Sequence, residues 1–494
     1  MAPSTTDSIA NSEGVVIKKT AFSISSIKLQ TASYPTRSLE FLQKLDQPAA
    51  SNGLLNGSSY LNGGSKPSPL LFKVIVVGAG LGGLATAIAL AKGGHVVTVL
   101  EQAPALGEVG AGIQVPPNSA KLLLKWGLGP LLGDRVVEPE GITFRRWSNG
   151  KPIGYTKLQP DFRSSFGAPY YVVHRAHLHD ALHQLALQLG VDVRVNHKVI
   201  EYNEENPSVK VEDGTILSAD LVIAADGVKS LARNHILRDE KKEPIRTGFA
   251  AYRATVDVEK MRDDPDTAWL LEKPALNIWI GPERHVMTYT IASGKSFNMV
   301  LSHIDHSDPS TWRPETAIDD MRAYFEGWDP KLFKVISKIN KTLKWPLMSG
   351  DASISRWVAQ SGKLLMLGDA AHAMVPYMSQ GAAMAVEDGA ALATSLSHVT
   401  DLSELPKALS IFETERMKRS GQMQEASLVN GRLWHFEDGP EQQARDEAMR
   451  PEVEGRHFIQ SPNQWSDPVT QAWAYGYDAE EEIEKRWKQS NNGG

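Results

Sequence analysis

The sequence contains no cysteine among its 494 residues. Disulfide bonds, thiolate metal ligands and a cysteine nucleophile are therefore excluded, and this composition suits a reducing compartment such as the cytoplasm. A surplus of positive charge is also missing, because 58 Asp and Glu outnumber 52 Lys and Arg. Nucleic-acid-binding proteins usually carry a basic face, so we expect no nucleic-acid partner, and we identify no metal site.

Long uncharged stretches are scarce. Residues 74–91 (VIVVGAGLGGLATAIALA) form an uncharged stretch of eighteen residues, with four glycines near its start. A membrane-spanning helix needs about 20 apolar residues, and the glycines favour a buried strand that turns into a buried helix. We expect no membrane span.

The first 68 residues differ in composition from the rest of the chain. They are rich in Ser, Thr, Asn and Gly, as in SNGLLNGSSYLNGGSKPSP. Such a segment buries too little apolar surface to offset the loss of chain entropy, which predicts a disordered tail over residues 1–68. No apolar core of a signal peptide follows the first residues. Basic and hydroxyl residues leave organelle targeting open, although Asp7 and Glu13 count against it.

A glycine-rich turn follows the first strand-like segment. The β-branched run at 72–77 leads into Gly78, Gly80 and Gly83, and an alanine-rich helical pattern follows. This is the G-x-G-x-x-G pattern in the strand–turn–helix order that gives it meaning. The first glycine allows the tight turn, the second lets a diphosphate approach the backbone, and the third lets helix and strand pack closely. The N–H groups at the helix start would then face the phosphates.

An acidic residue completes this nucleotide-binding unit. Glu101 ends a second strand at 95–100 and lies 18 residues after Gly83, near the spacing of an acid that binds ribose hydroxyls. Such an acid repels a 2′-phosphate, so the motif indicates FAD or NAD rather than NADP.

A second motif selects FAD. A short apolar strand at 364–367 is followed by Asp369, and a helical stretch opens at Gly381 and Ala382. An aspartate after a strand can accept a hydrogen bond from a ribityl hydroxyl, and a helix N-terminus can direct N–H groups at the flavin pyrimidine edge.

Three motifs carry a family resemblance: VVGAGLGG, LVIAADGVKSLAR and GDAAHAMVPYMSQGAAMAVED. In this order they resemble the single-component FAD-dependent aromatic hydroxylases, the class of p-hydroxybenzoate hydroxylase, within its salicylate hydroxylase-like branch. The resemblance covers residues 72–487. It implies an α/β fold with a Rossmann-like FAD-binding domain, an inserted antiparallel-sheet substrate domain and a helical C-terminal region. We place the FAD-binding domain at 69–245 and 351–400, the substrate sheet at 246–350, and the C-terminal helices and tail at 401–494.

The resemblance also implies roles for single residues. Glu101 would hold the adenosine ribose, Gly112 would lie beside the flavin, and Arg175 would contact the FAD phosphates or ribityl chain. Asp226 would serve FAD binding and the transient nicotinamide contact. From the residues alone, Arg175 could equally be a surface residue in the first turn of a helix. Asp226-Gly227 could be an ordinary turn. The position of His372 is scaffolding beside the flavin in the family.

The segment 246–350 contains short strands separated by turns, which is typical of an antiparallel sheet. Trp279, Tyr289 and Met299 alternate with polar neighbours, so one face can line an aromatic site. Arg253 lies in an apolar strand, where a charge is costly without a partner. Family members that hydroxylate phenols use an arginine and a tyrosine on these strands, which makes Arg253 and Tyr289 the candidate catalytic residues. An acid paired with Arg253 and simple packing of Tyr289 remain alternatives.

The resembled family suggests the reaction. NADH or NADPH reduces FAD and leaves, dioxygen forms a C4a-hydroperoxide, and one oxygen atom passes to a small phenolic or phenolic-acid substrate. The main alternative is a flavin-dependent epoxidase or a dearomatising hydroxylase of a larger secondary metabolite. An NAD-dependent dehydrogenase and a non-catalytic flavin-binding protein are less favoured, because the GDAAH segment argues for FAD and the flavin-site residues are retained. The sequence leaves the substrate, the choice of NADH or NADPH and the oligomeric state open, with a homodimer as one option.

Overall fold

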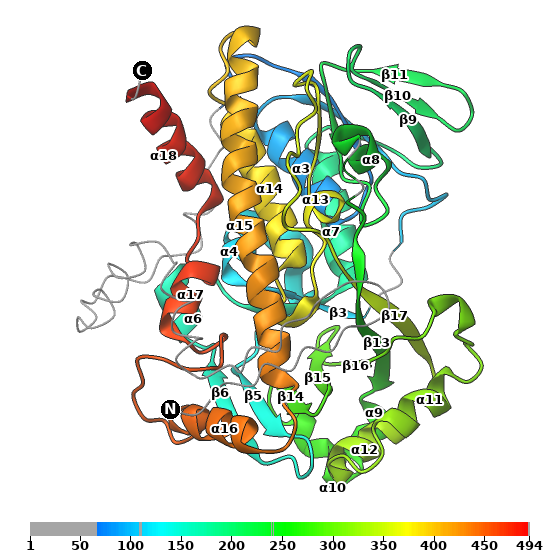
Figure 1. The fold of residues 1–494 in the computed structure, drawn as a ribbon, viewed down its shortest axis with the longest axis vertical. Helices are drawn as coiled ribbons and strands as arrows, with labels where there is room; N and C mark the ends of the chain where they lie inside the picture. The colour runs from blue at the N-terminus through cyan, green and yellow to red at the C-terminus, as the bar shows by residue number, and fades with distance from the viewer. Residues whose placement is uncertain (1–66, 108–110, 239, 241, 493–494) are drawn as a thin grey trace, which may run out of the picture.

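The computed structural model describes residues 67–107, 111–238, 240 and 242–492, so most of the expected N-terminal tail lies outside the described residues. Figure 1 shows two regions, a parallel sheet with its helices above and a larger sheet below. The helix α15 (Leu405–Trp434) runs along both regions. This arrangement confirms the predicted fold class.

The parallel sheet is the nucleotide-binding element. Its five strands have the order β18-β12-β1-β2-β8, and each neighbouring pair is parallel. Their bounds are β1 (Lys73–Val77), β2 (Val96–Leu100), β8 (Asp192–Arg194), β12 (Leu221–Ala224) and β18 (Leu364–Met366). Four of the five residues of β1 are buried, because strands of a parallel sheet are covered on both faces. The uncharged stretch at residues 74–91 therefore contains a strand and a helix, β1 followed by α3, as predicted.

Three helices cover this sheet near the site. They are α3 (Leu81–Lys92), α7 (Arg175–Gln188) and α14 (Gly381–Leu396), and α3 packs against the other two. The contact between α3 and α14 is close, since a β-carbon at Gly389 would lie 2.9 Å from Cα of Thr86. A glycine at this crossing lets the two helix backbones approach closely.

The larger sheet has seven strands in the order β17-β13-β16-β15-β14-β5-β6. Their bounds are β5 (Gly141–Arg146), β6 (Pro152–Lys157), β13 (Ile245–Asp257), β14 (Leu276–Gly281), β15 (Arg284–Ile291), β16 (Ser296–Ile304) and β17 (Thr342–Ser349). Strands β5 and β6 come from residues that the sequence prediction placed in the FAD-binding part. The four strand pairs within residues 245–350 are all antiparallel, as predicted for this segment. Strand β5 adds to this sheet through a parallel pair with β14 and pairs antiparallel with β6.

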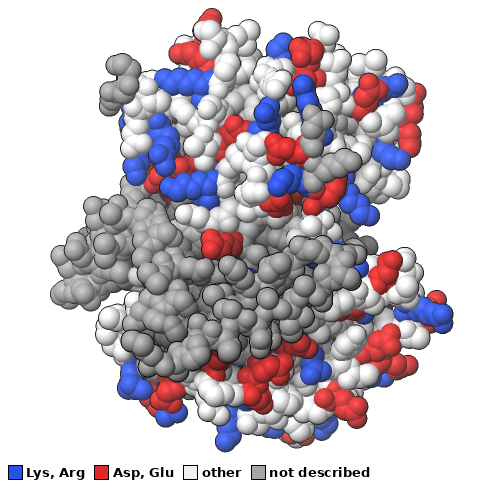
Figure 2. Space-filling view, in the orientation of Figure 1, with Lys and Arg blue, Asp and Glu red and all other residues white. Residues whose placement is uncertain are grey.

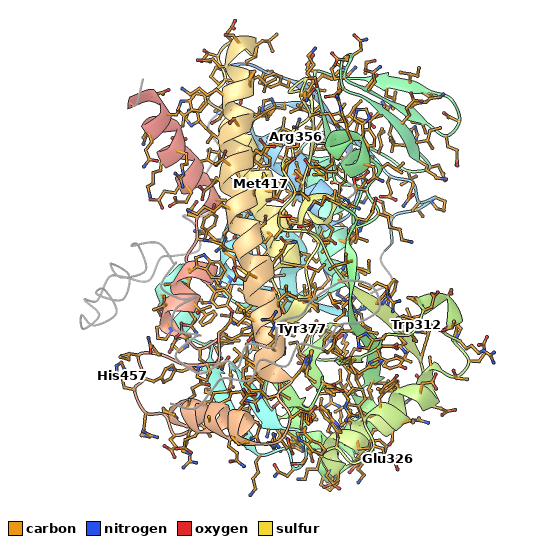
Figure 3. All side chains as sticks on the ribbon, in the orientation of Figure 1. Trp312, Glu326, Arg356, Tyr377, Met417 and His457 are labelled. Atoms are coloured by element: carbon orange, nitrogen blue, oxygen red, sulfur yellow. The ribbon has the colours of Figure 1, made fainter. Side chains whose placement is uncertain are left out.

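The C-terminal helices join the two regions. The side chain of Phe412, in the first half of α15, belongs to the core of the parallel-sheet region, whereas Leu433 and Trp434 at its end belong to the core of the larger sheet. In Figure 3, Met417 lies on the upper part of α15 and Tyr377 beside its lower part. The helices α16 (Pro440–Val453), α17 (Pro468–Tyr475) and α18 (Ala479–Asn492) complete the region.

The remaining strands form two small sheets. One contains β3 (Gly112–Val115), β4 (Val136–Val137) and β7 (Tyr171–His174), and the other contains β9 (Val199–Asn203), β10 (Ser208–Val211) and β11 (Ile216–Ser218). On the face shown in Figure 2, basic and acidic side chains are interspersed over the described residues. No helix in the described part of the chain is long and apolar enough to cross a bilayer.

Candidate active site

Two adjoining cavities lie between the parallel sheet and the larger sheet. The inner cavity has a volume of about 350 Å³ and the outer cavity of about 540 Å³. Both regions of the molecule contribute to their walls, and several residues line both cavities, so the two form one continuous cleft. The shared residues are Gly80, Arg175, Arg253, Leu347, Asp369, Met374 and Pro376.

The glycine turn between β1 and α3 forms one wall of the cleft. Gly78 has a φ of 103°, and a β-carbon at Gly83 would lie 1.9 Å from the carbonyl oxygen of Gly78. Both positions therefore require glycine for the turn itself. Gly80 differs, because a β-carbon there would meet no described atom within 4 Å. Gly80 precedes the first turn of α3, which has no acidic residue and no side-chain cap. The open space and the uncapped helix start suit a diphosphate.

Glu101 stands beside this turn at the end of β2. Its Oε2 accepts a hydrogen bond of 2.9 Å from the backbone N–H of Ala79, and Oε1 accepts one of 2.8 Å from Ala103. Glu101 also lines the outer cavity. The two backbone bonds fix the carboxylate while leaving lone pairs on both oxygens for ribose hydroxyls.

The second flavin motif lies across the cleft. Gly368 (φ 61°) follows β18 and places Asp369 at the start of the helix α13 (Asp369–His372). Asp369, Gly381 and Ala382 all line the inner cavity, the last two at the N-terminus of α14. The structure therefore brings the starts of α13 and α14 and the carboxylate of Asp369 to a single cleft.

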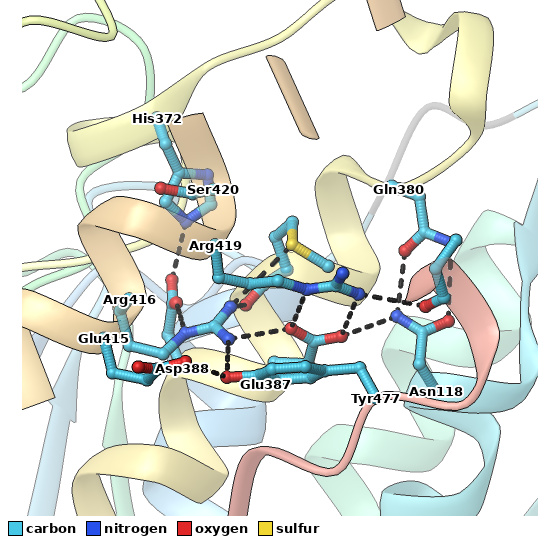
Figure 4. A network of polar contacts seen from close by, with 12 residues as sticks. Asn118, His372, Gln380, Glu387, Asp388, Glu415, Arg416, Arg419, Ser420 and Tyr477 are labelled. Atoms are coloured by element: carbon cyan, nitrogen blue, oxygen red, sulfur yellow. Dashed lines mark hydrogen bonds and ion pairs between the residues drawn. The ribbon is translucent and has the colours of Figure 1, made fainter. Parts of the chain in front are cut away.

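A buried polar network binds the backbone of this motif at Gly368 (Figure 4). Asp388 accepts hydrogen bonds from the backbone N–H of Gly368 (3.0 Å) and from Nε of Arg416 (2.8 Å), and it binds Nε2 of His372 at 2.6 Å. Arg416 also donates to Glu387 at 2.8 Å. Burial by itself raises the pKa of Asp388, but His372 and Arg416 together lower it to about 2. His372 thus acts as scaffolding, as the resemblance implied.

Positive charge gathers where the two cavities meet. Burial lowers the pKa of Arg175, the like charge of Arg253 lowers it further, and Asp369 opposes both effects. Burial likewise lowers the pKa of Arg253, and Tyr289 opposes the shift. The Nε of Arg253 is buried and has no hydrogen-bond partner among the described residues. An anion in the cleft would relieve the repulsion between the two guanidinium groups.

Tyr289 lies in the wall of the inner cavity and is 2% exposed. Its ring packs on the backbone of Gly112, where a β-carbon would lie 2.4 Å from Cε2 of Tyr289. Burial raises the pKa of the Tyr289 hydroxyl, which Arg253 and Gln114 only partly oppose. A protonated hydroxyl can hold a substrate by donating and accepting hydrogen bonds.

Among the predicted site residues, Gly78 and Asp226 line neither cavity. Gly78 acts through the turn. Oδ2 of Asp226 accepts hydrogen bonds of 3.0 Å from the Tyr202 hydroxyl and from the backbone N–H of Leu231, and Oδ1 is buried with no hydrogen-bond partner among the described residues. The flanking residues Ala225 and Gly227 line the inner cavity. The carboxylate thus anchors the start of α8 (Leu231–Leu237) through Oδ2, and its role in FAD binding stays a prediction.

The aromatic residues of the larger sheet do not share one face, contrary to the sequence prediction. Tyr289 pairs with Asn298 across β15 and β16, so Met299 points to the opposite face. Met299 and Trp279 belong to the hydrophobic cluster on that other face, where Trp279 donates a hydrogen bond to Asp329 at 2.8 Å. They are core residues, because the register of the strands separates them from the cleft.

Sequence reasoning missed other residues of the inner cavity. His285 and Met287 precede Tyr289 on β15 at every second position, and all three line the cavity. The period of two in a strand would have identified them. Gln114 on β3 also lines the cavity, and no local sequence pattern marked it as a site residue. Its side-chain oxygen accepts a hydrogen bond of 2.5 Å from the hydroxyl of Tyr170.

Comparisons with known proteins identify the family of this chain. The family model described as FAD binding domain matches residues 72–427. An FAD-dependent monooxygenase, OpS4, from Beauveria bassiana is 36% identical over 419 residues, covering 84% of this chain and 97% of the relative. A 3-hydroxybenzoate 6-hydroxylase from Polaromonas naphthalenivorans is 33% identical over 416 residues, covering 83% of this chain and 97% of the relative.

A solved structure of a salicylate hydroxylase substrate complex is similar with a TM-score of 0.69 and 25% identity, covering 84% of this chain and 98% of that chain. The open space at Gly80 and the helix starts of α3 and α14 fit FAD, which is the cofactor of this family. The chain therefore belongs to the single-component FAD-dependent aromatic hydroxylases and is an FAD-dependent monooxygenase.

Proposed function

We propose that this enzyme hydroxylates a small phenol or phenolic acid, using NADH or NADPH and dioxygen. The observation that carries the proposal is the pairing of Arg253 and Tyr289 in the wall of the inner cavity. Arg253 has a buried Nε without a hydrogen-bond partner among the described residues, and the Tyr289 hydroxyl is buried beside it. An arginine and a tyrosine facing one cavity suit a ring that carries an anionic group and a hydroxyl group.

Each side chain has a distinct role in this proposal. Arg253 binds the carboxylate or phenolate oxygen and stabilises its negative charge. Tyr289 exchanges a hydrogen bond with the second oxygen and orients the ring, with its own position fixed against Gly112. The apolar side chains of Met287, Val300 and Leu347 line the same cavity and exclude water. FAD, when bound and reduced by the nicotinamide cofactor, would activate dioxygen, from which one oxygen atom passes to the substrate and the other leaves as water.

The cofactor contacts are part of the proposal. Glu101 would bind the adenosine ribose, and the start of α3 at Gly80 would bind the diphosphate. Arg175 would add a positive charge at the phosphates or the ribityl chain. Asp369 would accept a hydrogen bond from a ribityl hydroxyl, and the N–H groups at the N-terminus of α14, at Gly381 and Ala382, would bind the pyrimidine edge. Gly112 would contact the flavin. All of these residues line one of the two cavities.

The size of the inner cavity supports a small substrate. Ligand sites usually measure about 300–1,000 Å³, and the inner cavity, at about 350 Å³, must also accommodate part of the flavin. A relative named for 3-hydroxybenzoate and a neighbour named for salicylate support a phenolic acid. The continuity with the outer cavity keeps a second candidate open, an epoxidase or dearomatising hydroxylase of a larger metabolite.

The test is oxidation of NADH and NADPH by the FAD-loaded protein with a panel of phenols and phenolic acids, with the products identified by mass spectrometry. We expect one class of phenol to accelerate the oxidation and to gain one oxygen atom. Stimulation only by larger polycyclic compounds would favour the second candidate. A flavin-loaded protein that responds to no aromatic compound would refute hydroxylation.

Variants of the binding pair sharpen this test. Arg253→Met removes a charge-assisted hydrogen bond worth about 1.5–3 kcal/mol, so KM should rise roughly 10- to 150-fold while the flavin absorbance is retained. Arg246→Met is the matched control, because Arg246 lies exposed on the same strand β13. Equal kinetics of the two variants would show that Arg253 does not bind the substrate.

A further inference from the structure

A third cavity lies at the far face of the larger sheet, outside the cleft described above. Its volume of about 650 Å³ is within the usual range of ligand sites. Its walls come from β17, the start of β15, the helix α11 (Ala317–Tyr324) and the segment 305–316. In Figure 3, Trp312 of this segment lies well apart from Tyr377 beside α15.

The larger sheet separates this third cavity from the flavin cleft. Lys344 lines the third cavity and pairs with Tyr252 across β17 and β13, so these two side chains share one face of the sheet. Arg253, the next residue on β13, lines the inner cavity and therefore points to the opposite face. Tyr252 belongs instead to the far-face cluster that contains Trp279. We therefore expect a ligand in the third cavity to bind without turnover.

Aromatic rings gather around the ammonium group of Lys344. This group lies 4.5 Å from the ring centre of Trp312, 5.2 Å from that of Tyr252 and 5.6 Å from that of Tyr324. Asp305, whose side chain is 4% exposed, pairs with the same ammonium group at 2.5 Å. The shared cation holds Trp312 and Tyr324 in place, and both rings line the cavity. Fixed aromatic rings in a cavity wall are suited to receive another flat ring.

The wall of the third cavity also carries a cation without an acidic partner. Nε of Arg284 donates to the backbone carbonyl of Pro282 at 3.3 Å, and Nη1 donates to that of Tyr324. Arg284 forms no ion pair with any acid in the described part of the chain, and Nη2 is left to meet a ligand. Three cations and two acids line the cavity: Arg284, Arg313, Lys344, Asp305 and Asp320. The surplus of positive charge and the fixed guanidinium group suit a carboxylate.

A buried hydroxyl group beneath this wall also lacks a partner. Tyr252 is 0% exposed, and its hydroxyl has no hydrogen-bond partner among the described residues. Burial raises the pKa of this hydroxyl, and Asp320, Tyr324 and Asp305 raise it further. Since these three residues line the cavity, the protonated hydroxyl lies close to it. Buried polar groups normally have a partner, which an acceptor atom in the cavity would supply.

We propose that the third cavity is a second, non-catalytic binding site for an aromatic carboxylate, with the ring of the ligand against Trp312 and Tyr324 and its carboxylate on Arg284. The two acids of the wall, Asp305 and Asp320, repel a second negative charge, so a monocarboxylate is favoured over inorganic phosphate. None of these five residues lines the inner or the outer cavity. Binding here is therefore independent of the proposed function.

The site is tested by titration calorimetry of the FAD-loaded protein with benzoate, cyclohexanecarboxylate and inorganic phosphate. The titrations are repeated in Arg253→Met, which lacks the cation of the inner cavity. We expect Arg253→Met still to bind benzoate, at one molecule per chain. Cyclohexanecarboxylate should bind about 2- to 12-fold more weakly, because it lacks the aromatic contact, and phosphate should bind more weakly than both. Absence of benzoate binding in Arg253→Met, or phosphate bound as tightly as benzoate, would overturn the proposal.

Variants of the wall locate the ligand, each combined with Arg253→Met. Arg284→Met should weaken benzoate binding about 10- to 150-fold, because it removes a charge-assisted hydrogen bond. Trp312→Leu should weaken it severalfold while leaving the backbone contacts of Arg284 intact, so the test does not depend on one variant folding. Arg262→Met is the control, because Arg262 is exposed on α9 (Glu259–Arg262) and pairs with Glu259 outside the cavity. Equal benzoate affinity of the Arg284, Trp312 and Arg262 variants would overturn the site.

Discussion

The buried network behind the flavin motif can be disrupted at one residue, Arg416. Its guanidinium is 0% exposed and donates hydrogen bonds of 2.8 Å to Glu387 and to Asp388, which are 0% exposed as well. Arg416→Met leaves these two carboxylates with fewer partners: His372 and the N–H of Gly368 remain for Asp388. Removing one member of a buried ion pair costs about 3–5 kcal/mol, because the remaining charge stays buried.

This cost can be converted into a melting temperature. The entropy of unfolding is about 2.1 cal/mol/K per residue, or roughly 1 kcal/mol/K for a chain of this length, so Arg416→Met should lower Tm by about 3–5 °C. The measurement is calorimetry of the FAD-loaded protein. Because Asp388 fixes the N–H of Gly368 next to Asp369, the variant should also release FAD more readily in an absorbance titration.

A matched control distinguishes this effect from the loss of any arginine. Arg450 is paired with Glu447 on α16, but its side chain is 56% exposed. Exposed ion pairs contribute about 0–1 kcal/mol, so Arg450→Met should change Tm by about 1 °C or less. A Tm of Arg416→Met within 1 °C of this control would refute the reasoning, because it would mean that the buried carboxylates find water or new partners at little cost.

Three further predictions follow from single positions. Burial raises the pKa of Glu452 from its ordinary value of 4.5 to about 7, so a contribution of about 3 kcal/mol that is present at low pH is lost as pH rises from about 4.5 to 7, where the unfolded chain ionises before the folded one. Glu452→Gln should therefore show a smaller fall in Tm between pH 4.5 and pH 7.5, and an unchanged fall would contradict it. Gly112→Ala should displace Tyr289 and raise the substrate KM about tenfold or more, since the new methyl group would lie 2.4 Å from the ring, and an unchanged KM would contradict it. Gly80→Ala should fold normally, because its β-carbon meets no described atom within 4 Å, but it should bind FAD more weakly than the control Gly421→Ala. Gly421 lies on α15 and lines neither cavity, and its β-carbon would meet only Ala352, at 4.0 Å. Equal FAD affinity of the two variants would show that the diphosphate lies elsewhere.

The sequence by itself determined the nucleotide-binding end of the cleft. The strand, the glycine turn, the helix and Glu101 are contiguous or nearly so, and each depends on local geometry that residue type dictates. Gly83 can only be glycine in this turn, because a β-carbon would collide with the carbonyl of Gly78. The second flavin motif was predictable for the same reason, as β18, Asp369 and the start of α14 follow one another along the chain.

The substrate end of the cleft was decided by tertiary structure. Arg253 and Tyr289 were identified through the family, yet only strand register shows that Tyr289 faces the cavity while Trp279 faces the core. A shift of one residue in a strand reverses every side chain, and the sequence pattern alone does not fix that register. Strands β5 and β6 likewise join the larger sheet through a parallel pairing with β14 that no local pattern indicates.

The long-range polar contacts were beyond local reasoning for the same physical cause. The hydrogen-bonded residues His285 and His435 are 150 positions apart, and the Asp226 carboxylate accepts a hydrogen bond from the Tyr202 hydroxyl, 24 positions away. Hydrogen bonds of this kind form only after helices and sheets have packed, and their partners depend on distances of a few ångströms that spacing in the sequence does not encode. The residue types and the turns determined which cofactor this chain binds, whereas the strand register of the larger sheet and its packing against the parallel-sheet region decided which side chains line the inner cavity.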